Sequence, residues 1–186
     1  MLSKYLDELE NSSKLIFVTG GTKSGKSEFA ELLLKNFCNV TYVALSHKRQ
    51  DDDNWQQKII MHRKRRSKSW RLIETIDLLT VLKSEHGPLL IDSIGGFIME
   101  NIELENKLWL MKMDLLIKNL KNRKSLTVIV GEQVGWSLVS EYKIGNIYIE
   151  RMGELQKMIT KISKDNWLAL NGRVIKIDDI SLEIPS

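Results

Sequence analysis

Cysteine is almost absent from this sequence, and so are long apolar runs. The single cysteine, Cys38, excludes an internal disulfide and any metal site built from several cysteines. No apolar run approaches the roughly 20 residues that a membrane-spanning helix needs. The N-terminal segment MLSKYLDELENSSK is too polar for the core of a secretory signal. We therefore expect a cytoplasmic protein that does not insert stably into a membrane.

A strong charge of either sign is also missing. Lys and Arg exceed Asp and Glu by 28 to 24, and this net charge of +4 is too small on its own to indicate nucleic acid as the partner. A chain of 186 residues suits one domain with a sizeable core. We expect residues 1–13 to form a loose N-terminal extension and residues 14–186 to form a single domain.

Short apolar segments alternate with helix-prone segments along most of the chain. Strands are predicted at 15–19, 40–45, 70–73, 89–92 and 126–130, and helices at 28–34, 51–66, 78–83, 103–120 and 143–164. This alternation predicts an α/β fold of three layers, in which a mostly parallel sheet carries helices on both faces. Near the end, Asn171-Gly172 suits a type I′ turn and predicts an antiparallel hairpin.

A phosphate-binding pattern follows the first predicted strand, with the spacing GxxxxGK[ST]. Its glycines let backbone amides face the phosphates of a nucleotide, and the following helix adds its positive N-terminal end. A glycine-rich turn can match by chance, but a strand before it and a helix after it are the context that the motif requires. Nucleotide contacts are therefore expected from Gly20, Gly21, Thr22, Lys23, Ser24, Gly25, Lys26 and Ser27.

Two side chains are candidates for holding the Mg²⁺ that accompanies such a nucleotide. In loops of this type the hydroxyl at Ser27 holds the ion, while the catalytic Lys26 reaches the β- and γ-phosphates. Asp92 ends an apolar strand, where a carboxylate commonly orients the ion during catalysis. Asp92 also suits a capping role for the segment that begins at Ser93, and the two roles are compatible.

The stretch from Lys58 to Glu74 is strongly basic around one histidine, His62. It allows three interpretations: a solvated helix face, a nucleic-acid patch, or the surroundings of a nucleophilic imidazole. In the third, neighbouring cations would stabilise the charge that develops when His62 attacks phosphorus. The cations that follow the histidine directly are Arg63, Lys64, Arg65 and Arg66.

Further motifs follow one another in a specific order. They are Gly20–Ser27, Tyr42-Val43-Ala44, Asp52-Asp53, His62 with Arg66, Trp70 and Glu74, Asp92, Val134-Gly135 and Met152-Gly153. From Leu15 to Ile177 this order resembles the bifunctional adenosylcobinamide kinase / adenosylcobinamide-phosphate guanylyltransferase family of cobalamin synthesis. The chain departs from the family pattern at Ser93-Ile94-Gly95, Glu132-Gln133, Ser140, Tyr142, Ile149, Gln156 and Lys157.

The resemblance implies a phosphate-loop fold related to RecA, assembled as a homotrimer, with His62 taking up GMP as the catalytic nucleophile. It also implies that Ser46, the residues 63–66 and Glu74 contact the nucleotide. ATP or GTP would phosphorylate the aminopropanol hydroxyl of adenosylcobinamide. GMP would then pass from GTP through His62 to that phosphate and give adenosylcobinamide-GDP. The implied cofactor is Mg²⁺, and the implied partners are the corrinoid and GTP, without nucleic acid.

Three other functions stay open from the residues: a plain phosphate-loop kinase, a nucleotide-binding regulator without catalysis, and a nucleic-acid binder. The last is the least favoured, because no aromatic residue lies within the run Arg63–Arg66 to stack on a base. A covalent label from GTP separates the guanylyltransferase from the plain kinase.

Overall fold

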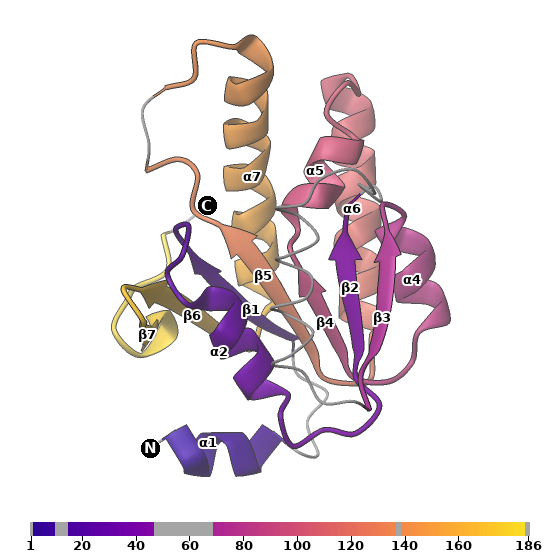
Figure 1. Cartoon of the computed structure of the whole chain (residues 1–186). Helices are drawn as coiled ribbons and strands as arrows, with labels where there is room; N and C mark the ends of the chain where they lie inside the picture. The colour runs from indigo at the N-terminus through magenta and orange to yellow at the C-terminus, as the bar shows by residue number, and fades with distance from the viewer. Residues whose placement is uncertain (1, 10–14, 47–68, 137–138, 185–186) are drawn as a thin grey trace, which may run out of the picture.

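The computed structural model describes residues 2–9, 15–46, 69–136 and 139–184, which form a seven-stranded sheet with helices on both faces (Figure 1). The strand order is β3-β2-β4-β5-β1-β6-β7, and every neighbouring pair is parallel except the antiparallel pair of β6 and β7. The elements are α1 (Leu2–Leu9), β1 (Leu15–Gly20), α2 (Lys26–Leu33), β2 (Thr41–Leu45), β3 (Arg71–Thr75), α4 (Leu78–Ser84), β4 (Leu89–Asp92), α5 (Gly95–Glu100), α6 (Asn106–Asn122), β5 (Thr127–Glu132), α7 (Lys143–Ile162), β6 (Asp165–Leu170), β7 (Arg173–Lys176) and the 3₁₀ turn η1 (Ile177–Asp179).

The predicted fold class and the predicted terminal hairpin are both confirmed. Strands β6 and β7 pair in antiparallel register, with Leu170 opposite Arg173. Between them Asn171 has φ 50° and Gly172 has φ 73°, the two positive values that a type I′ turn requires. The hairpin therefore extends the parallel sheet at the β1 side by one antiparallel strand.

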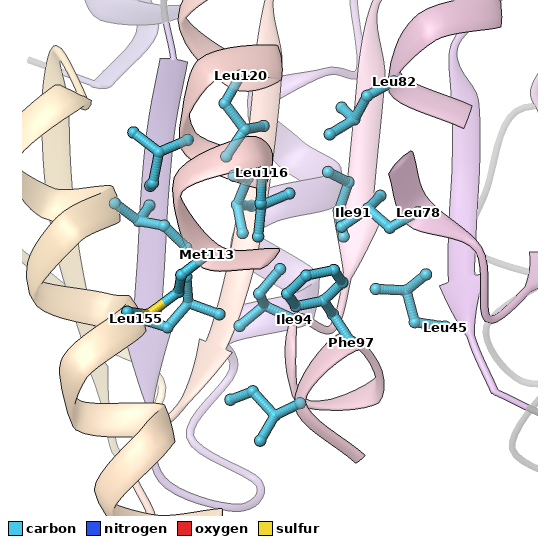
Figure 2. Packing of buried hydrophobic residues seen from close by; sticks show 14 of the residues in the cluster. Leu45, Leu78, Leu82, Ile91, Ile94, Phe97, Met113, Leu116, Leu120 and Leu155 are labelled. Carbon is cyan, nitrogen blue, oxygen red and sulfur yellow. The ribbon is translucent and has the colours of Figure 1, made fainter. Parts of the chain in front are cut away.

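Two apolar layers enclose the sheet, one on each face. Helices α4 to α7 cover one face, and Figure 2 shows Met113, Leu116 and Leu120 of α6 packed toward Ile91 of β4, with Phe97 of α5 beside them. Helices α1 and α2 cover the other face. Because both faces are covered, all six residues of β1 are buried, as is typical of a parallel sheet.

The first helix is held against the body of the protein. In α1, Leu6 is 5% exposed and Leu9 is fully buried, and the hydroxyl of Tyr5 donates a hydrogen bond of 2.8 Å to Asp165 Oδ2. The ring of Tyr5 also meets Trp167 edge to face. The expected loose extension is therefore not found at residues 2–9, because their apolar side chains share one helix face that packs on the sheet.

Two helices differ in detail from the prediction. Helix α6 begins three residues later than expected, since the carbonyls of Asn101, Ile102 and Leu104 accept hydrogen bonds from Arg151 and hold that segment in a turn. Helix α7 ends at Ile162, two residues before the predicted end, and is continuous through Gly145 and Gly153. The helix predicted at 51–66 lies outside the described residues. None of the described helices is long and apolar enough to cross a membrane.

Candidate functional site

The carboxyl ends of the parallel strands lie along one edge of the sheet, where α/β proteins commonly bind ligands (Figure 1). The loop of residues 20–27 joins β1 to α2, Ser46 follows β2, and Asp92 ends β4. Glu74 is the penultimate residue of β3 and lies opposite Ala44 of β2. The fold thus brings together at one edge all the predicted site residues that the structure describes.

The loop after β1 has the strand–loop–helix geometry that its motif requires. Gly25 has φ 96°, a value that glycine adopts without the steric cost of a Cβ atom. Helix α2 begins at the next residue, and the amide of Phe29 donates to the carbonyl of Gly25 at 2.9 Å. Lys26 Nζ donates to the carbonyl of Gly21 at 3.0 Å, so its ammonium group lies back across the loop.

Two neighbouring segments fix this loop from outside. The amide of Gln133, just beyond β5, donates to the carbonyl of Gly20 at 3.0 Å, and the amide of Gly172 in the hairpin donates to the carbonyl of Ser24 at 3.0 Å. A Cβ atom at Gly20 would collide with the carbonyl of Ala169 in β6. The loop conformation therefore depends on the strands on both sides of β1 as well as on its own glycines.

Asp92 is held by Tyr42, whose hydroxyl donates a hydrogen bond of 2.8 Å to Asp92 Oδ2. The capping interpretation of Asp92 is wrong, because α5 has Ile94 as its N-cap and no side-chain cap bond. Strand β5 lies between β4 and β1. At about 4.8 Å per strand, Asp92 is roughly 10 Å across the sheet from the loop.

The residues at this edge fit Mg²⁺ better than a metal caged by protein ligands. Within the described ranges no group of three or more His, Cys, Asp or Glu side chains is suited to hold a metal ion. Mg²⁺ usually takes one or two protein ligands and completes its shell with phosphate oxygens and water. The hydroxyl of Ser27 and the carboxylate of Asp92 are suitable ligands of that kind.

A third acidic residue, Glu132, ends β5 between the loop and Asp92, and sequence reasoning gave it no role. Its Cα is paired with that of Gly20 in the sheet register. Ser93 Oγ donates to Glu132 Oε1, whereas Oε2 is buried and has no hydrogen-bond partner in the described part of the chain. Burial raises the pKa of Glu132 above its usual value, the bond from Ser93 opposes this, and Asp92 and Lys26 act in opposite directions.

The next residue, Gln133, lies just beyond β5, and its side chain points to the opposite face of the sheet from that of Glu132, as alternation along an extended chain requires. Its Nε2 donates to Thr19 Oγ1 at 3.0 Å and to Gln156 Oε1 at 3.1 Å. Gln156 of α7 in turn donates to the carbonyl of Glu132 at 2.7 Å. The carboxylate thus faces the loop and Asp92, while the amide anchors the strand end to α7.

Comparison with known proteins decides the family. A family model described as cobinamide kinase / cobinamide phosphate guanyltransferase matches residues 16–177. The chain belongs to this family. Two relatives, from Escherichia coli K12 and Salmonella typhimurium LT2, are both named bifunctional adenosylcobalamin biosynthesis protein CobU. Each is 25% identical over 181 residues, which cover 88% of this chain and 99% of the relative.

Solved structures agree on the fold. A protein of Pyrococcus horikoshii OT3 superposes with a TM-score of 0.54 at 9% identity, covering 99% of this chain and 97% of its own. An ATPase of a bacterial type III secretion system superposes with a TM-score of 0.50 at 11% identity, covering 84% of this chain and 51% of its own. At such identities the likeness shows the fold alone, a mostly parallel α/β fold of the phosphate-loop NTPase kind.

Three departures from the family pattern, Ser93, Gly95 and Glu132, are neighbours in space. Ser93 donates to Glu132, and a Cβ atom at Gly95 would lie 3.0 Å from both carboxylate oxygens of Glu132 and would collide with the hydroxyl of Tyr148. Burial, and after it the charge of Glu132, raises the pKa of Tyr148. Linear spacing could not reveal this cluster, because Ser93 follows β4, Gly95 begins α5, Glu132 ends β5 and Tyr148 belongs to α7.

The basic segment gives a different outcome. His62 and the cations Arg63, Lys64, Arg65 and Arg66 lie outside the described residues, so their predicted roles rest on the sequence and the family. Ser46 and Glu74 are described, and both are half-buried at the same edge as Asp92. Their predicted contact with the nucleotide stays a prediction.

Proposed function

We propose that the chain is a bifunctional enzyme of cobalamin biosynthesis that phosphorylates adenosylcobinamide and then transfers GMP to the product. The observation that carries the proposal is the loop of residues 20–27, with Lys26 across it and Asp92 two strands away, in a chain whose family match spans residues 16–177. The loop binds the triphosphate of ATP or GTP, with Ser46 and Glu74 as further contacts at the same edge. The enzyme works in the cytoplasm.

In the kinase step a hydroxyl oxygen of adenosylcobinamide attacks the γ-phosphorus. A new P–O bond forms, the bond between the γ-phosphorus and the β–γ bridging oxygen breaks, and the nucleoside diphosphate leaves. Lys26 neutralises charge on the β- and γ-phosphates, as charge-assisted bonds do. Ser27 and Asp92 would hold Mg²⁺, which when bound supplies positive charge beside the transferring phosphate.

In the guanylyl step the imidazole of His62 attacks the α-phosphorus of GTP. A P–N bond forms, the anhydride bond to the β-phosphate breaks, and pyrophosphate leaves. The phosphate of adenosylcobinamide phosphate then attacks the same phosphorus and releases His62, giving adenosylcobinamide-GDP. Histidine suits this role because much of it is unprotonated near neutral pH, and Arg63 to Arg66 supply positive charge.

The enzyme is proposed to act as a homotrimer, and the outer face of α6 supports self-association. Leu108, Met111 and Leu115 recur at helical spacing on that face and are 48%, 60% and 39% exposed. Such an apolar stripe on a surface helix commonly marks an interface. Light scattering in solution tests it: a trimer is expected for the wild type and a smaller species for Met111→Lys.

Intact mass spectrometry after incubation with GTP and Mg²⁺ tests the guanylyl step. The wild type should gain one GMP, and acid should remove it, as expected of a phosphoramidate. His62→Ala should gain none while still binding GTP through the loop. His86→Ala, a change at an exposed histidine in the turn before β4, should gain GMP like the wild type.

Two results would contradict the proposal. A wild type without any GMP adduct would leave a plain kinase or a nucleotide-binding regulator. An adduct that survives in His62→Ala would assign the nucleophile to another residue.

A further inference from the structure

We propose that Glu132 is a catalytic residue of the phosphoryl-transfer step, where its free oxygen Oε2 accepts the proton of the attacking hydroxyl. Glu132 belongs to neither the phosphate loop nor the Asp92 strand. It ends β5, the strand between them. This inference rests on the proposed function only in naming adenosylcobinamide as the phosphate acceptor; the same role for Glu132 applies when water is the acceptor.

The position of Glu132 is that of a group beside the transferred phosphate. Its Cα is the sheet partner of Gly20, the first residue of the loop, and its carboxylate interacts electrostatically with both Lys26 and Asp92. The γ-phosphate of a nucleotide on this loop is expected near Lys26. A carboxylate at this position places negative charge beside the triphosphate and so weakens nucleotide binding. Its presence is therefore better explained by a role in catalysis than by a role in binding.

The carboxylate is held in one orientation with one oxygen unused. Ser93 donates to Oε1, while Oε2 is buried without a partner among the described residues. A buried carboxylate oxygen without a hydrogen bond costs free energy. The surroundings preserve this arrangement, because Gly95 leaves room for the carboxylate beside the hydroxyl of Tyr148.

Alternation along β5 specifies which of the two adjacent residues performs this role. Gln133 points to the other face and is engaged with Thr19 and Gln156, so only Glu132 faces the loop side. In the transfer, the O–H bond of the acceptor breaks and its proton goes to Oε2. The oxygen forms a bond to the γ-phosphorus, and the electron pair of the broken bond leaves with the nucleoside diphosphate.

The full-length protein with Mg²⁺ and γ-labelled ATP or GTP provides the test, with two acceptors measured side by side. One acceptor is adenosylcobinamide and the other is water, measured as released phosphate. Glu132→Gln should lower the rate with each acceptor by about 10²-fold or more, the usual contribution of a positioned base. It should keep the nucleotide dissociation constant within about threefold and the GMP adduct at His62, and its melting temperature should not fall below that of the wild type. Glu8→Gln, at an exposed site of α1, should match the wild type throughout.

Each outcome supports or overturns the role of Glu132. Wild-type hydrolysis that Glu132→Gln abolishes, without transfer to any corrinoid, overturns the proposed kinase activity and supports the role of Glu132 with water as acceptor. A variant that keeps its rate overturns the role. A variant that loses nucleotide binding or stability together with its rate also overturns it, because the carboxylate is then structural. A wild type that transfers phosphate to neither acceptor overturns it as well.

Discussion

The loop after β1 and the segment from the end of β5 into α7 lie at the same edge of the sheet but are determined in different ways. The loop follows a short sequence pattern, and its positive φ at Gly25 and the helix start at Lys26 are local features. The second segment depends on contacts between residues far apart in the chain, such as Gln156 with the carbonyl of Glu132. Residues in a local motif can be assigned from spacing, whereas the role of Glu132 depends on its spatial neighbours.

The largest effect is expected at Asp92, which shares the edge with both regions. Asp92→Asn should lower Mg²⁺-dependent turnover by roughly 10²-fold, since it removes the charge that would bind the ion while its oxygen can still accept the bond from Tyr42. Steady-state kinetics over a Mg²⁺ series measures this. Tyr42→Phe, which removes only the hydroxyl, should have a smaller effect. Full Mg²⁺-dependent turnover in Asp92→Asn would exclude the metal role.

The second-largest effect is expected for Lys26 and tests whether the loop of residues 20–27 itself binds the nucleotide. Lys26→Ala removes a charge-assisted contact to the phosphates and should weaken GTP binding by tenfold or more, equivalent to about 1.4 kcal/mol. Calorimetric titration measures it, with Lys35→Ala, at an exposed position in the turn after α2, as the matched control. Unchanged binding in a folded Lys26→Ala protein would show that the loop is only a glycine-rich turn.

The sequence predicted the features of the fold and site that depend on local signals and missed those that depend on contacts between residues far apart in the chain. Apolar periodicity predicted the parallel sheet, and the Asn171-Gly172 pair predicted the hairpin, because both signals are local. The start of α6 was missed because Arg151, about 50 residues away, binds the carbonyls of the preceding turn. The cluster of Ser93, Gly95 and Glu132 was missed for the same reason, since strand order decides which strand ends are neighbours.

A third prediction tests whether the long-range contacts hold the end of β5. Gln156→Leu removes two hydrogen bonds. The carbonyl of Glu132 loses its donor, and Nε2 of Gln133 loses one of its two acceptors. Losing buried hydrogen bonds of this kind costs about 1–3 kcal/mol, so the melting temperature should fall by several degrees. Differential scanning calorimetry measures it, and Lys157→Ala, at the exposed next position, should change little. An unchanged melting temperature would show that α7 does not anchor the strand.

The smallest effect concerns the charge of Glu132, and its sign depends on pH. Burial raises the pKa of Glu132 in the folded protein, so the folded state holds that proton more tightly than the unfolded state. The contribution of Glu132 to the free energy of unfolding is therefore complete below the pKa that this group has in the unfolded chain. It is lost as the pH rises through the higher pKa of the folded protein. Glu132→Gln carries no such charge, so its melting temperature should match that of the wild type in acid and exceed it at neutral pH. Thermal unfolding from pH 4 to pH 8 in the absence of nucleotide measures the difference, with Glu8→Gln as the exposed control. A variant that is less stable than the wild type at neutral pH would mean that the carboxylate is a structural anchor, like the glutamines on the other face of β5.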